Sequence, residues 1–260
     1  MRWWRPGVNV VNTGELLQYE AVATTRVSRA AYHHGDLPNA LADAATDLAR
    51  RGGPEAVVLR EAARQVGVSA AAAYRHFVGH GELLQAVKER ALAALADAMQ
   101  DGLASGERLA DPAADAVRRF ENLGRAYVGF ALANPGLFHT AFCRSPDSGP
   151  DARSGPDPRS GPDARSGPGI RSGPDVTARI AASRPYQILS GSLDELVAAG
   201  LLNPARREVA PIAFWAAVHG LATLLVDGPL AAMTESEQGE AVRRTLDILV
   251  QGISSPPRPA

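Results

Sequence analysis

The segment VGVSAAAAYRHF, Val66–Phe77, carries polar side chains of the kind that bind phosphate. Tyr74 and His76 can donate hydrogen bonds to phosphate oxygens, and Arg75 can reach either a phosphate or a base edge. Ser69 precedes four consecutive alanines, so its hydroxyl can bind a free amide at the start of a short helix. The segment has the form of a DNA-reading helix.

A helix-turn-helix would position these side chains, and the flanking pattern predicts one. Asp36 and Pro38 are typical of a helix start, where the Asp36 side chain can cap the free backbone amides. The basic residues and glycines of RRGG end that helix. A second helix is predicted over 59–65, Gly67 makes a tight turn, and a third helix ends near residue 76 or 77. The apolar residues of this unit are expected to face inward: Leu59, Ala62, Ala63, Val66, Val68 and Phe77.

Helical periodicity continues along the remaining chain, and no segment has the pattern of a strand. We therefore expect an all-α fold, in which a three-helix head is joined to a helical-bundle body. The body helices are expected at about 81–103, then one marked by Phe120, Leu123, Tyr127, Val128 and Leu132, and then at about 135–142, 180–199, 207–228 and 235–251. Asn134-Pro135 separates the third of these from the second, because a residue before proline disfavours helix.

Three segments depart from this pattern. Residues 1–31 lack helical periodicity and are predicted to be a disordered arm; VSRAAYHHGDL, from Val27, looks like a natural N-terminus, so Met1 is a candidate misassigned start. Within an insert at 145–175, the hexapeptide SGPDxR repeats, and its glycine and proline content predicts disorder. A partner-binding role is the alternative for this insert. Residues 254–260 are expected to form a frayed tail.

Composition excludes several classes of function. The net charge is −1, so any nucleic-acid site must be a local patch. No apolar run is long enough to span a membrane, and the single cysteine, Cys143, fits a reducing cytoplasm. The six histidines lack metal-protease spacing, and no glycine-rich phosphate loop follows a strand. We expect no enzyme activity, metal or cofactor, and an inert Cys143 thiol.

The stretch Tyr32–Val87 resembles the TetR family of bacterial transcription regulators. The resemblance rests on Gly67-Val68-Ser69, Tyr74, His76-Phe77 and Leu83-Leu84 at these spacings. It implies a DNA-binding head at 32–96, with the helix-turn-helix at about 58–77, and a ligand-binding and dimerisation body at 97–253. It also implies a homodimer, most simply a repressor, that a small-molecule effector releases from its DNA operator.

Carried over residue by residue, the resemblance implies these DNA-contacting positions: Arg60, Ser69, Ala70, Ala71, Tyr74, Arg75, His76 and His80. Two departures affect DNA affinity. Val58 stands where the family has a Ser or Thr that caps the second helix. The loss of this cap costs roughly 1 kcal/mol of helix stability. His80 replaces the usual cation before the fourth helix, and a neutral imidazole anchors phosphate more weakly.

The segment FWAAVHG, Phe214–Gly220, resembles the Trp-His-Gly signature of one TetR C-terminal domain class. Apolar and aromatic residues are candidate walls of an effector pocket, which favours a hydrophobic ligand: Leu137, Phe138, Phe142, Leu189, Leu193, Phe214, Trp215 and His219. The same residues would equally suit a plain core. The helices at 207–226 and 235–251 are expected to form a dimer interface. The alternative function is a helical ligand-binding or protein-interaction module that has lost operator binding.

Overall fold

The computed structural model describes residues 36–143 and 180–254. The predicted arm at 1–31, the repeat insert at 145–175 and residues 255–260 of the tail lie outside the described residues. Within the two described ranges, the structure consists of helices and the turns between them, without a strand. The all-α prediction is therefore confirmed.

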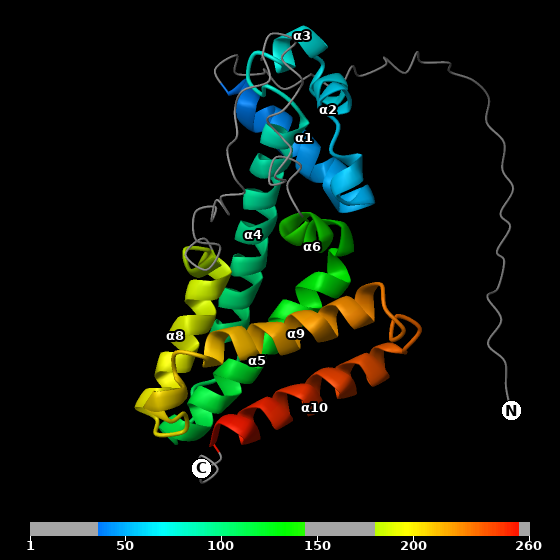
Figure 1. Ribbon diagram of the computed structural model, residues 1–260. Coiled ribbons are helices and arrows are strands. Elements are labelled where there is room, and N and C mark those ends of the chain that lie inside the picture. Colours follow the sequence, from blue (N-terminus) through cyan, green and yellow to red (C-terminus); the bar gives the residue numbers. More distant parts are fainter. Residues whose placement is uncertain (1–35, 144–179, 255–260) are drawn as a thin grey trace, which may run out of the picture. The chain divides into compact units, whose positions relative to one another are not determined.

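The head consists of three helices packed against the start of a fourth (Figure 1). Glycines with positive φ end two of them, at Gly53 (φ 69°) and Gly67 (φ 81°), where residues with a Cβ would be strained. Leu59, Ala62 and Ala63 are buried as predicted, and Phe77 closes the same core at 7% exposure. The bounds are α1 Leu37–Gly52, the short 3-10 helix η1 Pro54–Ala56, α2 Leu59–Val66, and α3 Ala70–Ala73.

Two local predictions for the head were wrong. The third helix ends at Ala73, because the N–H groups of Arg75 and His76 bond to carbonyls three residues back and tighten the last turn. Asp36 precedes α1 but makes no side-chain cap to the backbone; its carboxylate instead accepts a hydrogen bond from the Asn39 side chain at 2.7 Å.

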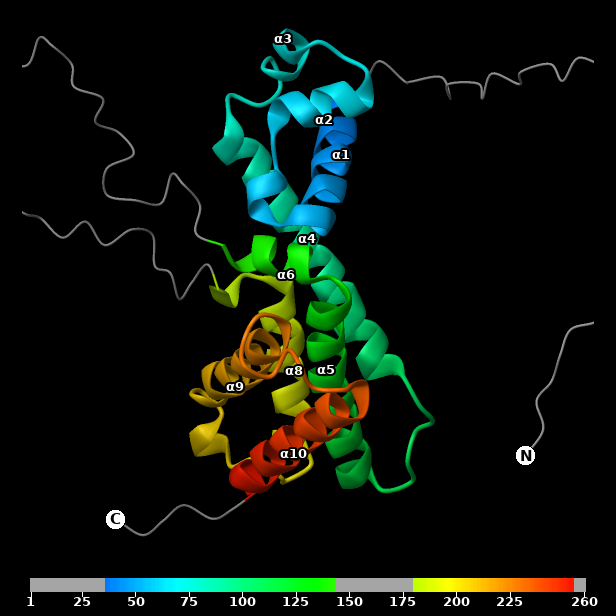
Figure 2. The same ribbon diagram turned by 90° about the vertical axis from the view of Figure 1, so that its right-hand side faces the viewer.

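The body is a bundle in which α5 is central: it contacts α4, α6, α8, α9 and α10. Figures 1 and 2 show α9 and α10 side by side, far from α3. The bounds are α4 His80–Ala104, α5 Pro112–Ala133, α6 Pro135–Phe142, α8 Arg184–Ala198, the 3-10 helix η3 Pro204–Arg206, α9 Ala210–Val226 and α10 Glu235–Ser254.

Two body helices begin later than the sequence predicts. The helix expected from residue 180 begins at Arg184, directly before Pro185, because proline fits only the first turn. The helix expected from Arg207 begins at Ala210, and Pro211 lies in its first turn. Arg207 instead donates to the Asp194 carboxylate at 2.6 Å and to Ser190 at 2.9 Å, which ties this turn to α8.

Head and body meet at α4 and α6. Arg90, on α4, donates to Asp43 and Asn39 of α1 at 3.1 and 2.9 Å. α6 contacts α1 through Gly136, where an added Cβ would lie 2.2 Å from the Ala49 carbonyl oxygen. Only glycine permits this approach, which brings α6 into close contact with the last turn of α1.

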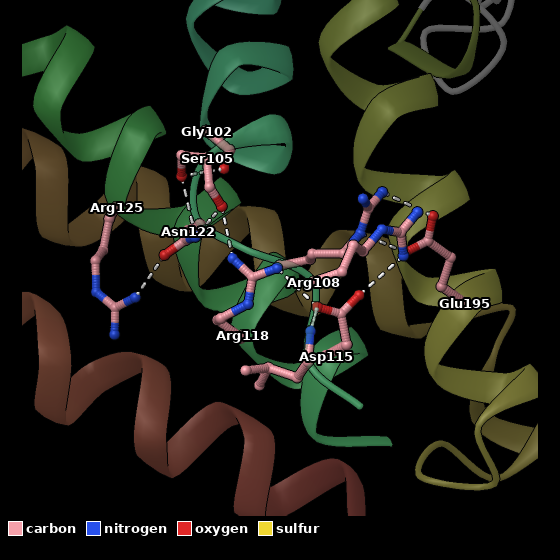
Figure 3. A network of polar contacts seen from close by, with 10 residues as sticks. Gly102, Ser105, Arg108, Asp115, Arg118, Asn122, Arg125 and Glu195 are labelled. Carbon is pink, nitrogen blue, oxygen red and sulfur yellow. Dashed lines mark hydrogen bonds and ion pairs between the residues drawn. The ribbon is translucent and has the colours of Figure 1, made fainter. Parts of the chain in front are cut away.

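The loop from α4 to α5 is fixed by a network of hydrogen bonds (Figure 3). The Asp115 carboxylate is 4% exposed and accepts hydrogen bonds from Arg118 at 2.7 Å, from Arg108 at 2.9 Å and from the Leu109 N–H at 3.1 Å. Arg118 also donates to the Ser105 carbonyl oxygen, just beyond α4. These guanidinium and amide donors hold the pKa of Asp115 well below its usual range. The network thereby joins the C-terminal end of α4 to α5.

Candidate functional site

The short helix α3 presents its alanines in opposite directions. Ser69 caps it as predicted: its hydroxyl oxygen accepts from the Ala72 N–H at 3.1 Å. Ala73 is fully buried against the head core, whereas Ala71 is exposed and Ala70 half-buried. The exposed side of α3 is therefore a smooth surface of methyl groups and backbone, which can approach the floor of a DNA groove closely.

The polar residues predicted to contact DNA surround this helix. Tyr74, Arg75 and His76 form the turn directly after α3, and Arg60 lies at the start of α2; all four are exposed. Within residues 36–143 and 180–254, none of these four side chains makes a hydrogen bond or an ion pair. Their donors are therefore available to phosphate. Arg64 differs, because the Glu61 carboxylate binds its guanidinium at 2.6 and 2.8 Å.

His80 begins α4, and its ring is held by the head. Nδ1 lies 2.9 Å from the Val57 carbonyl oxygen. A carbonyl oxygen only accepts, so Nδ1 carries the hydrogen, and the neutral ring has an acceptor at Nε2. Nε2 can donate to a phosphate only when the imidazole is protonated. The predicted phosphate contact at His80 thus requires the charged form of the ring.

The sequence did not single out two residues beside this turn. Val78 is 89% exposed, the largest exposure among the large apolar residues that the structure describes. The Glu82 carboxylate accepts from the Val78 N–H at 2.6 Å and so holds the chain at the start of α4. The only feature of the sequence that could have pointed to Val78 is its position, as a β-branched residue directly after His76-Phe77. An exposed valine beside α3 adds an apolar contact surface to the head.

The body contains a cavity of about 740 Å³ between α4, α5, α6, α8, α9 and α10. Most side chains on its wall are apolar or aromatic, which suits a small apolar ligand. Of the residues predicted to line a pocket, the wall includes four: Phe142, Leu189, Phe214 and Trp215. Leu137, Phe138 and Leu193 are instead buried in the core, with at most 3% exposure.

Tyr127 and His219 form a hydrogen-bonded group with Trp215 at the side of the cavity. The Trp215 indole N–H donates to the Tyr127 oxygen at 3.2 Å. Burial lowers the pKa of His219 and so favours its neutral ring, whose Nδ1 lies 2.9 Å from the Tyr127 hydroxyl oxygen. Burial likewise raises the pKa of Tyr127. His219 thus lies behind Tyr127 and does not line the cavity, whereas Tyr127, which the sequence did not indicate, does.

One end of the cavity is polar. Gln85, Lys88 and Glu89 of α4 line it, beside Cys143 at the end of α6. Lys88 Nζ donates to the Cys143 carbonyl oxygen at 2.6 Å, which connects α4 to α6. Burial raises the pKa of the Cys143 thiol, and its Sγ donates to the Thr140 carbonyl oxygen at 3.3 Å. Both effects favour the neutral thiol over the reactive thiolate.

The described residues, 36–143 and 180–254, lack two further features. No group of His, Cys, Asp and Glu among them is arranged to hold a metal ion. Within the same ranges, no helix combines the length and hydropathy that crossing a membrane requires.

Comparisons with known proteins agree with this geometry. The family model described as "Bacterial regulatory proteins, tetR family" matches residues 41–87, and the one described as "Tetracyclin repressor-like, C-terminal domain" matches residues 120–249, half of the 260 residues. A structure of a protein with unknown function from Rhodococcus sp. RHA1 is 26% identical with a TM-score of 0.63, over 87% of this chain and 100% of its own. A bacterial regulatory protein in the tetR family from Rhodococcus RHA1 shares the fold, at 17% identity and a TM-score of 0.51, over 85% and 98% of the two chains. No curated protein matches the chain.

Proposed function

Because the chain belongs to the TetR family of bacterial regulatory proteins, we propose that it is a homodimeric repressor which leaves its operator when a small, largely apolar molecule occupies the body cavity. It is a DNA-binding transcription regulator, in keeping with its family and its helix-turn-helix head. We further infer that it acts in the cytoplasm and catalyses no reaction.

One observation carries the ligand-release part of this proposal: α4 belongs to both sites. It begins at His80, beside the helix-turn-helix, and five of its residues between Gln85 and Met99 line the cavity. A ligand that displaces α4 therefore moves the head without touching DNA. Such control requires that the ligand bind the released conformation more tightly than the DNA-bound one.

The dimer is supported by apolar side chains left exposed on the last two helices. Val209 and Ile212 at the start of α9 are 66% and 47% exposed, Leu224 near its end is 43% exposed, and Ile248 of α10 is 68% exposed. Two α9–α10 pairs packed together would form a four-helix bundle and bury these side chains. Such a dimer must hold its two heads roughly 34–36 Å apart to enter successive major grooves.

An electrophoretic mobility shift with the DNA upstream of the gene tests the proposal. We expect a retarded complex at low salt, and no retardation with the double variant Tyr74→Ala, Arg75→Ala, whose exposed side chains are not needed for folding. Circular dichroism and sedimentation would verify that both proteins are folded dimers. If the folded wild-type dimer shifts no upstream fragment, the alternative of a ligand-binding module without operator binding takes its place. If a fragment is shifted, genome-wide footprinting with and without candidate metabolites would identify the operator and the effector.

A further inference from the structure

The His80 ring is fixed to the head through one of its two nitrogens. His80 is the first residue of α4, which begins beside α3 (Figure 1), and its side chain is exposed. Nδ1 lies 2.9 Å from the carbonyl oxygen of Val57, a fully buried residue of the head core. Since the two nitrogens of an imidazole point in diverging directions, this bond turns Nε2 away from the core. Nε2 makes no hydrogen bond or ion pair with residues 36–143 and 180–254.

A neutral ring cannot serve both the core and a phosphate. The Val57 carbonyl oxygen and a phosphate oxygen are both acceptors, so each needs an N–H from the ring. Neutral imidazole carries one such hydrogen in either tautomer, and its other nitrogen would turn a lone pair toward an acceptor. Only the protonated ring donates from both nitrogens, so it alone can keep its bond to Val57 and bind phosphate.

The acids near the ring do not pair with it. Glu61 of α2 is bound by Arg64 at 2.6 Å, and Glu82 of α4 accepts from the Val78 N–H at 2.6 Å. In residues 36–143 and 180–254, the histidine that forms an ion pair with an acid is His139, with Asp227. The full set of charged or titratable groups on the elements around His80 is Arg50 and Arg51 of α1, Glu55 of η1, Arg60, Glu61 and Arg64 of α2, Arg75 and His76 after α3, and Glu82 of α4.

We propose that binding of DNA takes up a proton at His80 of each head, so that this regulator holds DNA more tightly at pH 6 than at pH 8. The inference goes beyond the proposed release by an effector, and it rests on the predicted phosphate contact of His80. His76 differs, because its exposed ring has no partner within the described ranges. Its neutral form can therefore turn an N–H toward phosphate without taking up a proton.

The direction of the effect follows from which state holds the proton. The amide end of α4 carries partial positive charge, which opposes a charge on His80 in the free protein, whereas a bound phosphate favours it. At low pH the free ring is already protonated, so binding is strongest. As the pH rises, the complex must draw the proton from solution, and the affinity falls by at most about tenfold per pH unit for each proton taken up.

Fluorescence anisotropy with a labelled duplex tests the inference at pH 6, 7 and 8 and constant ionic strength. Phosphate contacts are independent of sequence, so any duplex that the protein retards at low salt can serve as the probe. We expect the Kd of the full-length wild type to rise by about tenfold between pH 6 and pH 8. Calorimetric titration at pH 7.5 in two buffers of different ionisation enthalpy should detect the proton uptake directly.

Three variants assign the effect. His80→Lys, charged at each of these pH values, should bind tightly at pH 8 and lose the pH dependence. His80→Gln should also lose it, because an amide donates without a proton from solution, and it should take up fewer protons in the calorimeter. His76→Gln is the matched control at an exposed histidine two residues after Tyr74, and it should keep the pH dependence of the wild type.

A wild-type Kd that stays constant from pH 6 to pH 8, or a pH dependence that persists in His80→Gln, would overturn the inference while DNA binding stands. If the wild type and His80→Lys, both folded by circular dichroism, bind no duplex at any of these pH values, then the DNA contacts of the head are contradicted together with this inference.

Discussion

At the scale of single residues, the proposed DNA contacts divide into those that hold DNA and those that discriminate its sequence. The exposed face of α3 offers methyl groups, which can touch thymine methyls but form no hydrogen bonds. The hydrogen-bonding groups lie in the turn that follows, at Tyr74, Arg75 and His76. Contacts to phosphate fix the position of a protein on DNA without specifying a sequence. We therefore expect this head to specify few base pairs.

Substitutions in the turn should separate the two tasks. Arg75→Ala should lower affinity for the operator by about 1–3 kcal/mol and relax the preference for it, because an arginine is the best base-reading group near α3. Tyr74→Phe should weaken operator and unrelated DNA alike by about 1 kcal/mol, because it removes one phosphate hydrogen bond. Competition mobility shifts with both DNAs measure the two effects. An unchanged operator preference in Arg75→Ala would assign sequence discrimination to the alanines or to DNA shape.

The Asp115 carboxylate should make stability depend on acidity. Arg118, Leu109 and Arg108 hold its pKa below the unfolded-state value of about 3.9, so the ionised form stabilises the fold. This contribution is fully present well above pH 4 and is lost as the pH falls through the lower folded-state pKa. Asp115→Asn should therefore be less stable than wild type at pH 7, and the difference should shrink below pH 4. Urea unfolding at pH 7, 5 and 3 measures it; a constant difference would contradict the assignment.

At the scale of elements, α6 packs against the head and also lines the cavity. It begins at Pro135, after the chain leaves α5, and it ends at the residue before Cys143, whose carbonyl binds Lys88. Between these ends, Gly136 lies against the last turn of α1. The short helix thus contacts the cavity through one end and the head through the other.

Glycine substitutions can test this contact. In Gly136→Ala, the new Cβ would lie 2.2 Å from the Ala49 carbonyl oxygen, so α6 must shift; overpacking of this kind costs about 1–3 kcal/mol. Gly129→Ala is the matched control, because a Cβ there meets no atom within 4 Å on an exposed face of α5. It should stabilise the helix by about 0.5–1 kcal/mol. Denaturant unfolding gives the free energies of unfolding of both variants. If Gly136→Ala is as stable as the wild type, the close α6–α1 contact is contradicted.

At the scale of the whole molecule, the proposed function depends on a second copy of the chain. The exposed apolar side chains of α9 and α10 lie in the half of the chain that matches the tetracyclin repressor-like C-terminal domain. A single head with few base contacts would bind weakly. Two heads on one operator bind cooperatively because the second binding event is intramolecular.

An arginine on the proposed interface should separate the subunits. Leu224→Arg places a charge at a half-exposed apolar position of α9, so burying it against a partner would be costly. We expect a folded monomer by analytical ultracentrifugation and a loss of operator binding of tenfold or more. Ala93→Arg, at an exposed position of α4, is the control and should stay dimeric. A dimeric Leu224→Arg would place the interface elsewhere.

Much of the fold could be predicted from local pattern. The turn at Gly67, the Ser69 cap and the end of α5 before Pro135 each depend on the conformational preferences of one or two residues. The errors also have local causes. The last turn of α3 tightened through alternative backbone bonds, and the start of α9 was displaced because Arg207 found partners on α8. Propensity does not encode such competition between neighbouring bonds.

The sequence alone therefore determined the class of the fold, since helical periodicity and the spacing around Gly67 are local properties, and its DNA-contacting residues remain predictions. Only the tertiary structure decided what the cavity is made of. Tyr127 and His219 are hydrogen-bonded although 92 residues separate them, and Lys88 meets the carbonyl of Cys143 across 55. Of the apolar residues that suited either a core or a pocket, Leu193 became core and Trp215 became wall. Hydrophobicity favours burial in both places equally, so the choice between them rests on how the helices pack.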